Sequence, residues 1–254
     1  MTSVRQTQEQ FGRQSQRYAD SPIHAEGESL GVLASFAAPR GGELAVDVGA
    51  GAGFTAAALA ARGARAIATD LAPPMLERTR ELASRRGLAL GLALAQGEAL
   101  PFADGAIDIV ACRLACHHFR DLPRALREFR RIVAPRGRVV IADTVAPEDP
   151  ALDAWMNGLE LRRDPTHVRD LKPSEWRALL ASAALRLEQD FMARSPQEFE
   201  VWVSRAGTPA DAIPGLRRDF ENPPPGAVEE FGIAYGAGTI TWAWGNYVML
   251  AHPV

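Results

Sequence analysis

The sequence has few of the features that mark secreted, membrane-spanning or metal-binding proteins. It contains only two cysteines, Cys112 and Cys116, which stand four residues apart in an apolar stretch. Two such thiols form neither a disulfide framework nor, without a third and fourth ligand nearby, a metal site. We therefore expect a cytoplasmic protein with no bound metal. The polar start, residues 1–21, lacks the apolar stretch of a signal peptide, and no apolar run approaches membrane-spanning length.

An excess of positive charge is also absent. The formal net charge is −3, and the five histidines are scattered along the chain. We therefore expect a small molecule as the partner, with neither nucleic acid binding nor membrane insertion. Hydrophobic residues make up 47% of the 254 residues, which is enough for a core without disulfide support. The expected organisation is a single domain, as a monomer or a homodimer.

Short apolar runs alternate with helical stretches over the first 143 residues. Five strands are predicted, at residues 44–48, 66–69, 90–95, 107–112 and 138–142. Helices are predicted at 4–18, 25–37, 55–61, 73–86 and 123–133, with a Pro-Arg-Gly turn at 135–137. Strands separated by helices pair in parallel and are covered on both faces. The fold class is therefore α/β, with a doubly wound, Rossmann-like sheet.

The last third of the chain has a different pattern. Residues 152–161 and 174–184 predict helices, and residues 185–192 predict a sixth strand. Residues 222–226, which include three prolines, predict a loop, and residues 239–250 predict a long strand or hairpin. We interpret the aromatic residues of this last segment, Trp242, Trp244 and Tyr247, as sheet packing rather than as a cage for a cation.

A glycine-rich turn joins the first strand to the helix that follows it. Residues 46–54 read Val-Asp-Val-Gly-Ala-Gly-Ala-Gly-Phe. A strand that turns sharply into a helix uses glycine for unusual dihedral angles and for close approach of a ligand to the backbone. Asp70 closes the next strand, where a carboxylate can accept hydrogen bonds from both hydroxyls of a ribose. Together these features predict a site for a nucleoside-containing cofactor.

The residues of the turn also distinguish between two such cofactors. Nicotinamide dinucleotides use the fingerprint G-x-G-x-x-G, whose third glycine would fall where Phe54 stands. Asp47 would face a pyrophosphate badly, but it can orient the turn or meet an ammonium group through water. S-adenosylmethionine offers an ammonium group and no phosphate. The turn therefore favours S-adenosylmethionine.

Four segments match the motifs of one known family. Residues 46–53 match E/D-x-G-x-G-x-G, and residues 95–102 match G-D-A-E-x-L-P-F. Residues 111–119 match a post-strand stretch that ends in a His-His or Leu-His pair, and residues 130–143 match a helix, turn and strand with R-x-L-x-P-G-G. In these motifs the chain resembles the class I S-adenosylmethionine-dependent methyltransferases, near the ubiquinone and menaquinone C-methyltransferases. The resemblance implies a mostly parallel, seven-stranded sheet with an antiparallel last strand.

The resemblance implies roles for the matching residues. Gly49, Ala50 and Gly51 would approach the methionyl part of the cofactor, and Asp70 would hold the ribose. Gln96 replaces the usual aspartate beside the adenine, so an amide oxygen would accept the hydrogen bond of the adenine amino group. The expected cofactor-binding residues are Tyr18, His24, Asp47, Gly49, Ala50, Gly51, Gly53, Asp70, Leu71, Gln96, Gly97, Glu98 and Arg113, with Arg113 near the sulfonium and with Tyr18 and His24 closing over the cofactor from the N-terminal helices.

The candidates for catalysis are His117, His118, Asp143 and His167. Methyl transfer is an in-line displacement, so positioning matters most, and a base is needed only where the acceptor must first lose a proton. His117 and His118 follow the fourth strand, where ligands of α/β proteins bind. They either orient or deprotonate the acceptor, or they pack and cap a loop. Asp143 either points into the acceptor pocket or caps the next turn, and His167 belongs either to a pocket cover or to a solvated loop.

The sequence thus predicts an enzyme that transfers a methyl group from S-adenosylmethionine to a small organic acceptor, at carbon, oxygen or nitrogen. Residues 1–40 would form a helical cap, residues 41–145 the cofactor-binding core, and residues 146–254 the acceptor-pocket cover and closing strands. We expect the N-terminal helices and residues 147–173 to roof the acceptor pocket. Phe11, Trp155 and Met156 favour a hydrophobic or aromatic acceptor. Two alternatives are a protein that binds the cofactor but catalyses another reaction, such as a cyclisation, and a nicotinamide-dependent oxidoreductase.

Overall fold

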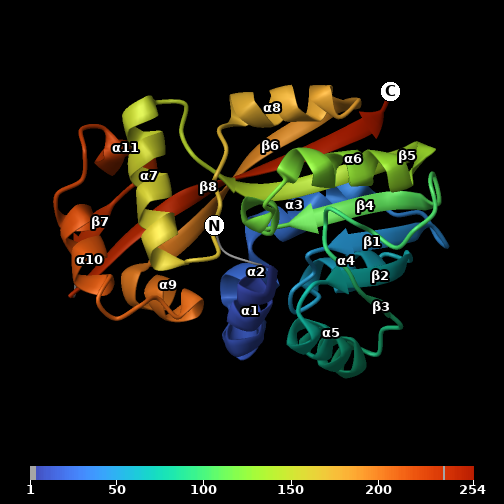
Figure 1. Cartoon of the computed structure of the whole chain (residues 1–254), viewed down its shortest axis with the longest axis horizontal. Coiled ribbons are helices and arrows are strands. Elements are labelled where there is room, and N and C mark those ends of the chain that lie inside the picture. The colour runs from blue at the N-terminus through green and yellow to red at the C-terminus, as the bar shows by residue number, and fades with distance from the viewer. Residues whose placement is uncertain (1–3, 237) are drawn as a thin grey trace.

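A computed structural model describes residues 4–236 and 238–254, in which a single sheet runs through the molecule (Figure 1). Its strand order is β3-β2-β1-β4-β5-β8-β6, and β7 pairs with β8. The strands are β1 (Leu44–Val48), β2 (Arg65–Asp70), β3 (Gly91–Leu94), β4 (Ile107–Arg113), β5 (Val133–Val145), β6 (Leu185–Glu198), β7 (Ala234–Gly236) and β8 (Thr239–Pro253). The sheet therefore has eight strands rather than the predicted seven, because the short β7 forms a hairpin with β8.

The direction of the strands agrees with the prediction. Strands β1 to β5 pair in parallel, whereas β8 is antiparallel to both of its neighbours, β5 and β6. The predicted turn at residues 135–137 was wrong. These residues belong to β5, whose pairing with β4 shifts register between Ile107 and Ile109. Strand β6 also continues beyond residue 192 to Glu198.

The helices of the N-terminal half are α1 (Val4–Ala19), α2 (Pro22–Glu26), α3 (Glu28–Ala37), α4 (Phe54–Ala60), α5 (Pro73–Arg86), the short 3-10 helix η1 (Cys116–His118) and α6 (Leu122–Ile132). Those of the C-terminal half are α7 (Pro150–Arg163), α8 (Pro173–Ser182), α9 (Phe199–Ala206), α10 (Ile213–Glu221) and α11 (Ala227–Phe231). Most match the predicted segments. The segment 25–37 is divided at Gly27, which precedes α3 with an extended backbone. In the described residues, no helix is both long enough and apolar enough to cross a membrane.

Helices cover both faces of the parallel part of the sheet. On one face α6 and α8 pack against Val139 and Ile141, and on the other α3 and α4 pack against Val140 and Ala142. Successive residues of a strand point to opposite faces, so the continuous apolar run of β5 supplies both cores. This double cover is the reason why these strands show no alternation of apolar and polar residues.

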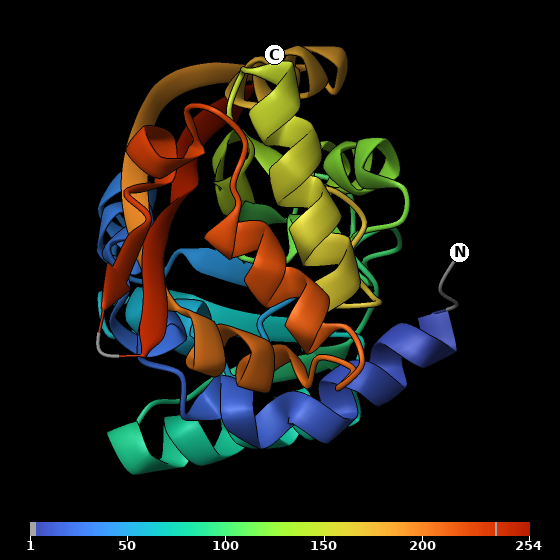
Figure 2. The same cartoon turned by 90° about the vertical axis from the view of Figure 1, so that its left-hand side faces the viewer.

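The long strands β6 and β8 extend beyond this core to a second apolar cluster. There α7, α9, α10 and α11 gather at one end of the sheet (Figures 1 and 2). Trp242 and Trp244 are buried among these helices, and Tyr247 is buried in the core under α8. The interpretation of the three aromatic residues as packing is therefore confirmed. Helix α1 lies between this cluster and the parallel sheet, in contact with both α5 and α9 (Figure 2).

Candidate active site

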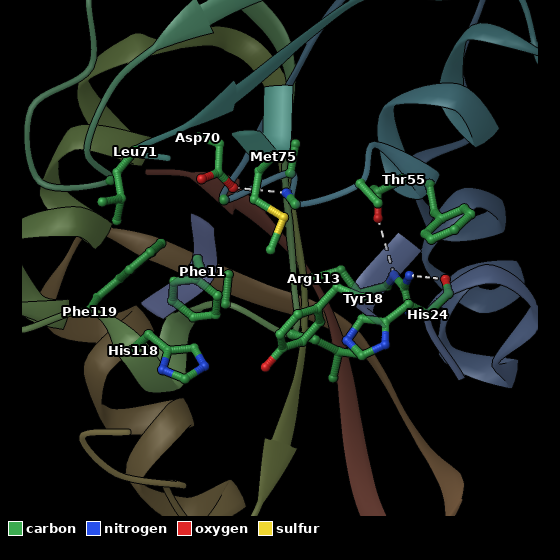
Figure 3. Close-up of a pocket in the computed structure, with 18 of the residues that line it drawn as sticks. Phe11, Tyr18, His24, Thr55, Asp70, Leu71, Met75, Arg113, His118 and Phe119 are labelled. Atoms are coloured by element: carbon green, nitrogen blue, oxygen red, sulfur yellow. Dashed lines mark hydrogen bonds between the residues drawn. The ribbon is translucent and has the colours of Figure 1, made fainter. Parts of the chain in front are cut away.

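The glycine turn after β1 has the unusual backbone that the sequence predicts. The φ angles of Gly49, Gly51 and Gly53 are 68°, 55° and 86°. A Cβ atom at Gly49 would lie 2.6 Å from the Cβ of Ala115, so a larger residue does not fit there. A Cβ atom at Gly51 would instead meet nothing within 4 Å. The open space beside Gly51 belongs to a cavity of about 790 Å³, which we call the first cavity (Figure 3).

Most of the predicted cofactor residues line the first cavity, namely Tyr18, His24, Gly49, Ala50, Gly51, Asp70, Leu71, Gly97 and Arg113. Gln96, Glu98, Gly53 and Asp47 do not. The Glu98 carboxylate accepts the backbone N–H of Arg120 at 3.1 Å, which explains why it faces away. Sequence reasoning missed others in the wall, among them Thr55, Met75 and Phe119. No motif marks Thr55 or Met75, and Phe119 ends the matched segment 111–119 without a role implied for it.

Asp70 joins the turn to the end of β2. Its Oδ2 accepts the N–H of Gly51 at 2.9 Å, and its Oδ1 accepts the N–H of Ala72 at 2.8 Å (Figure 3). Burial raises the pKa of Asp70, and the two N–H groups oppose that rise. A carboxylate has about four lone-pair sites, so two stay available for hydroxyl donors from a ligand in the cavity.

Two buried groups of opposite charge have unused hydrogen-bonding atoms near the turn. Arg113 donates Nε to the Thr55 hydroxyl at 3.1 Å and Nη2 to the carbonyl of His24, whereas its buried Nη1 has no partner among the described residues. Asp47 accepts the N–H of Ala56 with Oδ2 at 2.9 Å, and its Oδ1 likewise has no partner there. Burial raises the pKa of Asp47 to about 7. Arg113 lines the first cavity, and its unused Nη1 fits the carboxylate of an amino-acid group, as S-adenosylmethionine carries, whereas Asp47 does not line that cavity.

A second cavity, of about 560 Å³, adjoins the first. Phe11, Tyr18, His24, Leu114 and His118 line both cavities, so these side chains form the boundary between them. In the view of Figure 3 the rings of Phe11, Tyr18 and His118 lie across the first cavity from Asp70. Most of the rest of the wall of the second cavity comes from α7, the loop after it, β6, α9 and β8, and Ile23, His117 and Thr144 complete it.

The structure brings three predicted catalytic histidines together. His117 and His118 are adjacent in sequence, and His167 lies about fifty residues further along the chain. Ring centroids lie 4.2 Å apart for His117 and His118, 5.4 Å apart for His117 and His167, and 6.1 Å apart for His118 and His167. All three line the second cavity. Asp143 is only 1% exposed and lies beneath His117, whose Nδ1 donates to its Oδ1 at 2.6 Å and whose backbone N–H donates to its Oδ2 at 2.8 Å. Asp143 therefore positions His117 instead of pointing into a cavity.

The histidines differ in charge. Burial lowers the pKa of His117, but the charge and the hydrogen bond of Asp143 outweigh it and raise that pKa to about 9. Burial and the charge of His117 lower the pKa of His118 to about 4. At neutral pH His117 is therefore protonated and His118 is neutral. Burial also holds the pKa of His167 well below its usual range.

Two other expectations about the acceptor pocket need comment. The loop after α7 is not a solvated surface, because Asp164, His167 and Asp170 are all buried. Together with residues of α1 and α2 it lines the second cavity. Trp155 and Met156, however, pack in the apolar cluster around α10 and do not line this cavity. The prediction that Trp155 and Met156 line an acceptor pocket was therefore wrong.

Known proteins share this fold and this site region. The family described as "Methyltransferase domain" matches residues 46–141. The uncharacterized methyltransferase YcgJ of Bacillus subtilis is 38% identical over 203 residues, which cover 79% of this chain and 80% of that protein. The crystal structure of YcgJ has a TM-score of 0.83 at 33% identity and covers 89% of this chain and 97% of its own. The protein BH2331 of Bacillus halodurans has a TM-score of 0.84 at 28% identity, with 90% and 100% covered.

A further relative lies in the branch that the motifs indicate. The demethylmenaquinone methyltransferase of Thermus thermophilus is 39% identical over 104 residues, 40% of this chain and 47% of that protein. None of these relatives supports the nicotinamide-dependent alternative. The chain belongs to the S-adenosylmethionine-dependent methyltransferases, and S-adenosylmethionine is its cofactor.

Proposed function

We propose that the chain methylates a small organic molecule that sits in the second cavity, while the cofactor sits in the first. The observation that carries this proposal is the shared boundary of the two cavities. A methyl group passes between two ligands only where their reacting atoms meet in line, and this boundary is where ligands of the two cavities would touch.

The chain's own residues would hold the cofactor at both ends. The second pair of Asp70 lone-pair sites would accept the ribose hydroxyls, and Arg113 Nη1 would donate to the carboxylate. Gly51 leaves room for the ligand against the backbone. When bound, S-adenosylmethionine supplies a methyl group on a positively charged sulfur. It would supply that methyl group to the acceptor atom and leave as S-adenosylhomocysteine.

His118 is the residue that we assign to the acceptor. Its Nδ1 lies 3.2 Å from the carbonyl oxygen of Thr166, which can only accept a hydrogen bond, so the neutral ring carries its proton on Nδ1. Nε2 then serves as an acceptor that orients a hydroxyl or amine, or takes the proton that the acceptor releases. A weak base suffices for a hydroxyl acceptor, because its oxygen becomes strongly acidic once it is methylated. His117, with Asp143 and His167, would fix the position of this ring.

We also propose that the chain forms one domain with three tasks. Residues 1–40 would close the cofactor cavity, residues 41–145 would carry most of the cofactor site, and residues 146–254 would supply most of the acceptor site. The shared sheet and the contacts of α1 with both α5 and α9 support this arrangement.

The test is the formation of S-adenosylhomocysteine with a panel of small acceptors. We expect release that depends on the acceptor, and His118→Gln to lower kcat at least tenfold while the Kd for S-adenosylmethionine changes less than threefold. His252→Gln, a histidine of β8 outside both cavities, is the control and should behave as the wild type. The non-methylating alternative would be favoured by a different result. In that case the cofactor binds tightly, no acceptor in the panel causes release of S-adenosylhomocysteine, and any product formed carries no added methyl group.

A further inference from the structure

The second cavity has two arginines in its wall. Arg163 ends α7 and Arg205 lies near the end of α9. The side chain of Arg163 is 11% exposed and Arg205 is 8% exposed, so both guanidinium groups are largely shielded from water. Removing a cation from water costs several kcal/mol unless an anion or hydrogen-bond acceptors compensate it. The partners of these two arginines therefore decide what the cavity is suited to bind.

Arg163 has a carboxylate partner and a backbone acceptor. Its Nη1 donates to Glu160 Oε2 at 2.8 Å, and its Nε donates to the carbonyl of Trp202 at 3.0 Å. The other carboxylate oxygen of Glu160 accepts the indole N–H of Trp202 at 3.1 Å and that of Trp244 at 2.8 Å. The charge and the hydrogen-bonding capacity of Glu160 are thus committed to Arg163 and the two indoles.

Arg205 has no such partner. Over residues 4–236 and 238–254 its only hydrogen bond runs from Nη2 to the side-chain oxygen of Gln197 at 2.8 Å, and no carboxylate lies within ion-pair distance. Gln197 is a neutral amide that donates in turn to Ser195 Oγ at 3.0 Å. Burial and the neighbouring Arg163 lower the pKa of Arg205 to about 10, which leaves it charged at neutral pH.

The other acid in the wall does not compensate this charge. Asp170 is 1% exposed, and the Nε2 atom of His167 lies 3.7 Å from its Oδ2. Neither carboxylate oxygen of Asp170 has a hydrogen-bond partner in the described part of the chain. Burial raises the pKa of Asp170 well above its usual range. No ion pair joins Asp170 to Arg205 in the described residues. Arg205 therefore remains an uncompensated buried cation beside a cavity.

We propose that the methyl acceptor is a carboxylic acid whose carboxylate binds Arg205, with Gln197 and Ser195 beside it. A planar carboxylate matches the fork of a guanidinium group and replaces the missing anion. The apolar part of the acceptor would lie against Phe11, Trp202 and Trp244, toward the boundary with the first cavity. This inference rests on the proposed function, because it names the class of acceptor for the same reaction.

The experiment compares acids with their amides on the enzyme loaded with S-adenosylhomocysteine. The probes are benzoate, phenylacetate and 3-phenylpropanoate, each paired with its primary amide, and the readouts are calorimetric Kd values and thermal shift. The proteins are the wild type, Arg205→Gln, Arg205→Lys and the control Arg62→Gln. Arg62 is an exposed arginine outside both cavities, and its side chain donates to the carbonyl of Ala58.

We expect at least one acid to bind the wild type tenfold or more tightly than its amide. Arg205→Gln should remove that preference, Arg205→Lys should keep part of it, and Arg62→Gln should leave it intact. An unchanged Kd for S-adenosylhomocysteine in Arg205→Gln and Arg205→Lys shows that both variants are folded. No preference for any acid, or a preference that survives in Arg205→Gln, overturns the inference. If neutral acceptors are methylated while no acid binds, the proposed function stands and only the inference about Arg205 fails.

Discussion

The carboxylate of Asp70 supports two turns and faces the first cavity at the same time. Asp70→Asn keeps one acceptor oxygen but loses the charge and one of the two hydrogen bonds to Gly51 and Ala72. We expect it to weaken binding of S-adenosylmethionine by about 1.5–3 kcal/mol, roughly 10- to 100-fold, as measured by calorimetry. Asp108→Asn is the matched control, because Asp108 also accepts a backbone N–H, that of Leu44 at 2.8 Å, outside the cavity. Equal losses in both variants would mean that Asp70 acts only on the fold.

The pair of His117 and Asp143 predicts a pH dependence of stability. The folded pKa of His117 is about 9, above the usual 6.5, so the native state holds this proton more tightly than the unfolded chain does. The resulting stabilisation, roughly 3 kcal/mol, is complete below about pH 6.5 and disappears as the pH rises through about 9. Chemical denaturation of the wild type and His117→Gln between pH 6 and 9.5 measures it. The difference in unfolding free energy should shrink as the pH rises. A constant difference would contradict the assignment.

A motif that fixes the backbone allowed some residues of the site to be predicted from the sequence. Gly49 and Gly51 belong to such a motif and Asp70 closes the next strand, and the structure places all three at the first cavity. Arg205 had no such signal, because one arginine in a short helix is ordinarily solvated. Its position became clear only after β6, α9 and α7 were brought together, which depends on contacts far apart in sequence. The prediction for Trp155 and Met156 was wrong for the same reason, because their packing also depends on contacts far apart in sequence.

At the scale of the element, substitutions of two glycines should separate an effect on folding stability from an effect on cofactor binding. Gly51 and Gly87 both have positive φ, 55° and 62°, and a Cβ atom at either would meet nothing within 4 Å. Alanine in this backbone region costs about 1–2 kcal/mol, so both variants should lose similar stability in denaturation. Only Gly51→Ala should lose affinity for S-adenosylmethionine, because only Gly51 borders the first cavity. Calorimetry on the two variants tests this. Equal affinity would show that the ligand does not approach the turn.

Helix α1 covers the boundary of the two cavities with few buried contacts of its own. Thr7 and Ser15 are its buried residues, and Gln8 and Gln10 donate to the carbonyls of Leu71 and Ala206, both at 2.7 Å. Such an element opens more readily than the core. We expect S-adenosylhomocysteine to slow amide hydrogen exchange in α1 at least fivefold and to leave α10, which lines neither cavity, unchanged. Protection limited to the glycine turn would contradict a covering role for α1.

The periodicity of the sequence predicted the elements of the parallel sheet well and its irregular parts poorly. Helix α5 has the predicted bounds, since proline begins it and Gly87 ends it in the left-handed region. The error at residues 135–137 has a physical cause. Proline and glycine mark a break in regular pairing, and a shift of register within β5 provides that break as well as a turn does.

At the scale of the whole molecule, the account depends on where the cofactor binds. A crystal structure with bound S-adenosylhomocysteine tests this most directly. We predict that the ligand occupies the first cavity, with its ribose at Asp70, its backbone contact at Gly51 and its carboxylate at Arg113, and that the second cavity stays open beside its sulfur. A ligand bound elsewhere, or a sulfur that faces away from Phe11, Tyr18 and His118, would contradict the account.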